Sequence, residues 1–116
     1  MEKFILLFRG GINHAYNANE SNEAMENMKE WMNWMGGLQQ KGIMVAADPF
    51  LPTGKQVIGF GKKVADGAYV QNEEQVGGYL IVNANDIDDA VEISKGCPVL
   101  KENGKVEIRP IQKMEM

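Results

Sequence analysis

Apolar residues along the chain follow two different periods, which predict strands and helices in a definite order. Every residue from Phe4 to Phe8 is apolar, so both alternating faces of Lys3–Arg9 suit a strand that is covered on both sides. Four further runs predict strands: residues 43–47, residues 56–65 with a turn at Gly61-Lys62, residues 76–82 and residues 105–110.

Two segments instead have the period of a helix. In residues 22–41, one helical face carries Ala24, Met28, Trp31, Met35 and Leu38, and Met25 and Met32 widen this stripe. A second helix is expected over residues 86–95, with Asn85 as its N-cap and aspartates in its first turn.

The resulting order is strand, helix, strand, strand, strand, helix, strand. It predicts an α+β fold of the ferredoxin-like β-α-β-β-α-β type with an extra hairpin strand, in one domain over residues 1–116. Helices on one face of such a sheet leave its other face bare. Because the strand at Lys3–Arg9 is apolar on both faces, we expect a homodimer in which a second copy covers the bare face.

Composition and charge narrow the classes of function. The formal net charge of −4 disfavours a general nucleic-acid binder and docking on an anionic membrane, since both need a basic surface. No apolar run is long enough to cross a membrane, and the five-residue apolar stretch near Met1 is too short for a secretory signal. The single cysteine, Cys97, cannot form an internal disulfide, which predicts a cytoplasmic protein.

The stretch from Val64 to Val82 carries a family resemblance. Its Asp66-Gly67, Glu74-Gln75-Val76 and Gly77-Gly78-Tyr79 resemble the signature of YCII-related proteins of the DGPF type, and the resemblance extends through residues 85–90, 97–98 and 106–110. Ala68 and Tyr69 stand where the family pattern has proline and phenylalanine. The resemblance implies a dimeric α+β barrel. It does not imply a reaction, although sigma-factor genes beside some such proteins imply a regulatory setting.

Two residues are candidates for acid–base catalysis. Asp66 lies on the signature at a strand end, where its carboxylate could act as a base or could cap the Asp-Gly turn. His14 is the only histidine, with an unperturbed pKa near neutrality, but it falls in a polar segment where an exposed loop histidine is the more common reading.

Four further residues are candidates for ligand binding. Arg9 ends an apolar strand and needs an anion, either a ligand or the carboxylate of Asp66 or Glu74. Trp34 lies off the apolar stripe of its helix and could face a pocket or a partner, although core packing is more common. If the residues after Asp66 line a site, Tyr69 and Glu74 belong to it. We expect Arg9 and Asp66 to border one pocket beneath the first helix.

No metal or cofactor site is expected. One histidine and one cysteine cannot form a closed zinc site, and helix capping explains the acidic run Asp86–Asp89. The glycine pairs are not followed by helices in the register of a phosphate loop. Cys97 follows a helix C-terminus, which raises the pKa of a thiol, so a catalytic role is not expected.

Three functions remain open. The first is a dimeric module that binds a small molecule or a regulatory partner. The second is a cofactor-independent lyase or isomerase that uses Asp66, with or without His14, for proton transfer. The third is a purely structural dimer. The absence of histidine and cysteine from the signature favours the binding module.

Overall fold

The computed structural model describes residues 1–10, 22–72 and 74–114. The strands are β1 (Glu2–Arg9), β2 (Met44–Pro49), β3 (Lys55–Ile58), β4 (Lys63–Asp66), β5 (Val76–Ala84) and β6 (Lys105–Pro110). The helices are α2 (Asn22–Gln40), α3 (Ile87–Ser94) and the short 3₁₀ helix η1 (Pro98–Glu102). This order confirms the predicted α+β class. For most strand ends, the observed first or last residue differs from the predicted one by one or two positions.

The main sheet has the strand order β2-β5-β1-β6, and all neighbouring strands are antiparallel. Each helix therefore connects two strands that flank a third: α2 joins β1 to β2 across β5, and α3 joins β5 to β6 across β1. This interleaving of two β-α-β units is the ferredoxin-like arrangement.

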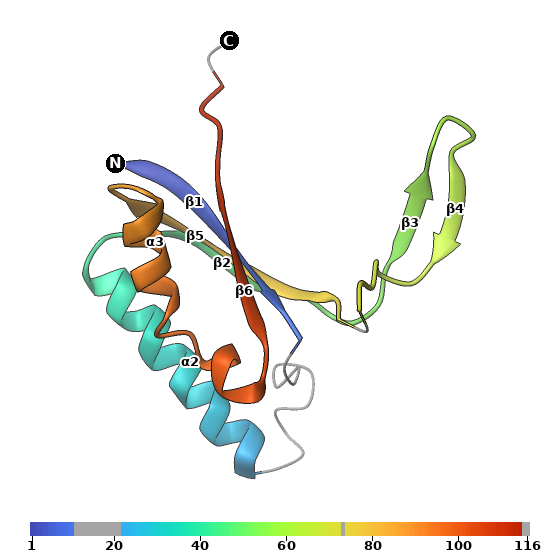
Figure 1. The fold of residues 1–116 in the computed structure, drawn as a ribbon. Helices are drawn as coiled ribbons and strands as arrows, with labels where there is room; N and C mark the ends of the chain where they lie inside the picture. The colour runs from blue at the N-terminus through green and yellow to red at the C-terminus, as the bar shows by residue number, and fades with distance from the viewer. Residues whose placement is uncertain (11–21, 73, 115–116) are drawn as a thin grey trace.

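The two helices cover one face of this sheet (Figure 1). The side chains of Phe4, Leu6, Leu80 and Val82 point to that face and are almost completely buried. Register explains the grouping, because Leu6 pairs with Leu80 on one side and with Ile108 on the other. The alternating pattern of β1 and β5 thus builds the core on one face of the sheet.

The buried stripe of α2 is rotated from the prediction. Leu38 is buried and Trp31 is half-buried, as expected, but Met25 and Met32 are exposed. Trp34 instead joins the packed side, because the connection from α3 to η1 lies against it: a Cβ added to Gly96 would come within 2.9 Å of the Trp34 indole nitrogen. Periodicity cannot reveal this second neighbour, since it comes from a distant segment.

The helix termini follow local chemistry, with one correction. Gly42 has a φ of +72° and ends α2, and the N–H of Ile43 donates to the carbonyl of Leu38. The N-cap of α3 is Asp86 and not Asn85: the Asp86 carboxylate accepts from the N–H of Asp89 at 2.8 Å, while the Asn85 N–H donates to the Asp89 carboxylate.

Strands β3 and β4 form a separate two-stranded sheet, in the segment where the extra hairpin strand with a turn at Gly61-Lys62 was expected. Their turn spans Gly59–Lys62, where the N–H of Lys62 donates to the carbonyl of Gly59. The hairpin stands clear of the main sheet and of both helices (Figure 1).

None of the described helices covers the other face of the main sheet (Figure 1). Ile5, Leu7 and Ile81 point to this face and are half-buried. Arg9, Glu107 and Arg109 form a chain of ion pairs beside them. We call this surface the open face. Among the described helices, none is long and apolar enough to span a membrane.

Candidate ligand pocket

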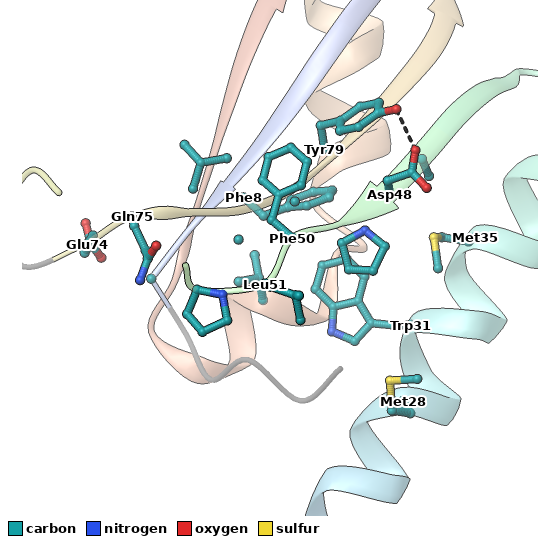
Figure 2. Close-up of a pocket in the computed structure, with 18 of the residues that line it drawn as sticks. Phe8, Met28, Trp31, Met35, Asp48, Phe50, Leu51, Glu74, Gln75 and Tyr79 are labelled. Atoms are coloured by element: carbon teal, nitrogen blue, oxygen red, sulfur yellow. Dashed lines mark hydrogen bonds between the residues drawn. The ribbon is translucent and has the colours of Figure 1, made fainter. Parts of the chain in front are cut away.

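A pocket with a cavity volume of about 370 Å³ lies where α2 passes the ends of β2 and β5. Its wall on the helix side includes Met28, Trp31 and Met35 (Figure 2). The exposed Met32 also lines it. Phe8, at the end of β1, also lines the pocket. The same apolar stripe that holds α2 against the sheet therefore also provides one side of the pocket.

Aromatic rings pack at right angles along this wall. The Phe8 and Trp31 rings are 5.0 Å apart with an interplanar angle of 77°, and Trp31 meets Trp34 at 5.9 Å and 76°. Edge-to-face geometry of this kind is favoured between aromatic side chains. It holds the Trp31 ring in place while the thioethers of the neighbouring methionines can adapt to the shape of a ligand.

The segment after β2 closes the pocket, and a glycine of the signature determines where it lies. A Cβ on Gly78 would come within 2.9 Å of the Asp48 carbonyl oxygen, so only glycine permits this approach of β2 to β5. The N–H of Phe50 then donates to the carbonyl of Gly77. These contacts place Phe50 and Leu51 at the pocket.

The hydrogen-bonded pair Asp48 and Tyr79 lies at the rim of the pocket (Figure 2). The Tyr79 hydroxyl donates to the Asp48 carboxylate at 2.7 Å, and the Phe50 ring packs 5.8 Å from the tyrosine ring. The hydrogen bond to the Asp48 carboxylate raises the pKa of Tyr79, because it stabilises the protonated phenol. Tyr79 is therefore a hydrogen-bond donor at neutral pH and not a base.

Glu74 and Gln75 lie at the other end of the pocket (Figure 2). The Glu74 side chain is only 20% exposed, and its carboxylate accepts a hydrogen bond from the Lys105 ammonium at 2.7 Å. A Cβ at Gly10 would collide with this carboxylate, so the glycine after β1 makes room for it. The predicted ligand-binding residue Glu74 thus borders the pocket, with its charge balanced by a lysine.

Arg9 and Asp66 do not share a pocket, contrary to expectation. Arg9 pairs with Glu107 at 3.2 Å on the open face. Asp66 belongs to the hairpin, where its side chain is 88% exposed and pairs with the directly opposite Lys55 at 2.8 Å. The sequence places both residues at strand ends, but only the tertiary structure shows that these ends lie in different sheets.

The other predicted site residues are also dispersed. Trp34 packs against Phe8, Trp31 and Gly96 and does not line the pocket. Tyr69 follows the hairpin and is exposed. His14 lies outside the described residues.

Cys97 is a buried free thiol at the start of η1. Burial raises its pKa to about 12, so the reactive thiolate does not form at neutral pH. Within the described ranges, no group of three or more histidine, cysteine or acidic side chains could hold a metal ion.

Comparison with known proteins agrees with this architecture. The family model for the YCII-related domain matches residues 12–115, which is most of the chain. The chain belongs to the YCII-related family. A search of curated proteins gave no match. Membership of the YCII-related family confirms the resemblance on the signature, and it assigns no reaction to these residues.

Sequence analysis did not identify the pocket residues in the segment after β2. Phe50 and Leu51 fall in a segment with two prolines and a glycine, which predicts only a loop. The sequence did offer one signal, which is that two large apolar residues are adjacent within this loop. Apolar side chains that gather on a surface often mark a binding site.

Proposed function

We propose that this YCII-related chain is a homodimeric module that binds a small apolar molecule in the pocket beside α2. The pocket carries the proposal. Its volume falls in the range of small-molecule sites, and its walls are mainly aromatic and methionine side chains with a few polar groups at the ends. The regulatory setting implied by the resemblance fits a module of this kind, which would pass ligand occupancy on to another protein.

The polar groups at the two ends favour binding over proton transfer. The Tyr79 hydroxyl keeps its proton and donates it to the Asp48 carboxylate, and the Glu74 carboxylate is paired with the Lys105 ammonium. The alternative, a cofactor-independent lyase or isomerase, needs a carboxylate or His14 at the reacting atom. Asp66, its main candidate, lies on the hairpin and points to solvent.

The open face supports the homodimer. Ile5 and Leu7 of β1 and Ile81 of β5 form an apolar strip on the two central strands. Ion pairs lie at the border of this strip. An apolar face with a charged border suits a two-fold interface. We also propose that the dimer is cytoplasmic, because the single thiol of each chain is buried and unpaired. Each chain would form one domain over residues 1–116.

A fluorescent apolar probe tests the pocket. N-phenyl-1-naphthylamine should bind the wild type and should bind Met28→Glu ~10-fold more weakly, because the new charge must be desolvated in the pocket wall. Met25→Glu is the matched control, since Met25 is exposed on the same helix. Equal binding by both variants would contradict a ligand site at this position.

Size-exclusion chromatography with light scattering tests the dimer. The wild type should have about twice the 12.9 kDa mass of the chain. Leu7→Glu should reduce the mass to that of one chain, because it places a charge on the open face. A monomeric wild type at micromolar concentration would contradict the proposed interface.

A further inference from the structure

The hairpin of β3 and β4 has no packing partner within the described part of its own chain. Its strands pair only with each other, and four large apolar side chains are exposed on it. These are Val57, Ile58, Phe60 and Val64, of which Phe60 at the turn is fully exposed. We call residues 55–66 the arm.

An arm of this size is not stable by itself in water. Each strand has four residues, and an isolated two-stranded hairpin is marginal unless its side chains pack on another surface. The cross-strand pair of Val57 and Val64 contributes only a small free energy. The exposed apolar side chains of the arm therefore indicate that another surface packs against them when the protein functions.

The position of the arm relates it to the open face. In the view of Figure 1 the arm rises from the end of the sheet on the side away from α2 and α3. A molecule that covers the open face would therefore lie on the same side of the sheet as the arm. A second copy that packs sheet to sheet brings its own body within reach of Phe60.

The charge of the arm also fits a second copy of the chain. The arm contains Lys55, Lys62, Lys63 and Asp66, so its formal charge is +2, whereas the whole chain carries −4 and the remainder therefore −6. Lys62 lies in the turn that carries Phe60, and Lys63 follows directly after it. A basic, apolar tip is complementary to the acidic body of another copy.

From these observations we infer that the arm clasps the body of the second copy, with Phe60 as its apolar anchor. This inference rests on the proposed homodimer and adds an interface to it. The two arms of a two-fold dimer would act reciprocally, so each copy would be held both at its open face and by the arm of its partner.

Photo-crosslinking tests the contact directly. Phe60→p-benzoylphenylalanine, prepared as a mixture of unlabelled and 15N-labelled protein, should give crosslinked peptides of mixed isotope composition that join residue 60 to the body of the other copy. Ile87→p-benzoylphenylalanine is the control, because Ile87 is exposed on α3 on the covered side. Crosslinks within one chain, crosslinks only between two arms, or none would overturn the inference.

Removal of the arm separates this inference from the proposed dimer. The N–H of Gly67 donates to the carbonyl of Gly54 at 2.8 Å, so the chain can be joined across the base of the arm without displacing the body. Deletion of residues 55–66, and Phe60→Ser alone, should each raise the dimer dissociation constant ~10-fold or more. The control Leu100→Ser changes an exposed apolar residue on η1 and should not change it.

The outcomes of the two tests are distinct. A wild-type dimer that is dissociated by Leu7→Glu but unaffected by arm deletion would overturn the clasp and leave the proposed dimer intact. A wild-type monomer would overturn both.

Discussion

The two faces of the main sheet are built from the same strands but have different environments. On the covered face, Leu6 is completely buried between Leu80 and Ile108. On the open face, its neighbour Leu7 lies between Tyr79 and Glu107 and is half-buried. The apolar pattern of β1 is the same on both sides, so it is the placement of the helices that distinguishes core from surface. The half-buried apolar residues of the open face are the reason for the proposed dimer.

The largest expected effect concerns stability. Leu6→Ala should lower the free energy of unfolding by about 3–5 kcal/mol at every protein concentration, because it leaves a cavity in the covered core. Leu7→Ala should have an effect that grows with concentration, because Leu7 would become fully buried in the proposed dimer. Urea unfolding at several concentrations measures both. Equal, concentration-independent losses would remove the distinction between the faces.

The pH dependence of stability sharpens the comparison on the covered side. Burial raises the pKa of Cys97 from its ordinary 9.0 to about 12, so the folded protein retains this proton where the unfolded chain loses it. The contribution of Cys97 to the free energy of unfolding is complete below pH 9. Between pH 9 and 12 this contribution decreases by about 1.4 kcal/mol per pH unit. Cys97→Ala should remove this slope from the unfolding free energy. An identical slope in the variant would contradict the effect of burial.

A smaller effect separates the two residues that could cap α3. Asp86→Ala should cost about 1 kcal/mol, because it removes the acceptor for the N–H of Asp89. Asn85→Ala should cost much less, since the contact of Asn85 with Asp89 uses only its backbone N–H. Thermal unfolding of both variants measures the difference, and a larger loss for Asn85→Ala would restore the cap predicted from sequence.

The smallest effect is expected at the signature aspartate. Asp66→Asn should change stability by less than about 0.5 kcal/mol, because its ion pair with Lys55 is exposed and screened by solvent. It should leave the affinity for N-phenyl-1-naphthylamine unchanged, since Asp66 does not line the pocket. Weaker probe binding by this variant would return Asp66 to the site and would favour the enzymatic alternative.

Several residues of the pocket could be predicted from the sequence, but the way in which they come together could not. The periodicity of α2 identifies Met28, Trp31 and Met35 as one face, and this face forms a wall of the pocket. Glu74 was a candidate and borders the pocket. The pair of Asp48 and Tyr79 was missed, because 31 residues separate its members and only the pairing of β2 with β5 brings them together.

The sequence by itself determined the order of the main elements, the fold class, the family and the glycine that ends α2. These depend on local periodicity, on glycine and proline conformations and on a short signature, all of which are encoded within a few residues. Only the tertiary structure decided that the segment after β2 forms an independent arm, that Asp66 lies far from Arg9, and that Trp34 is packed by Gly96. Each of these depends on which distant segments come into contact, and the free energy of such contacts is not contained in any local pattern.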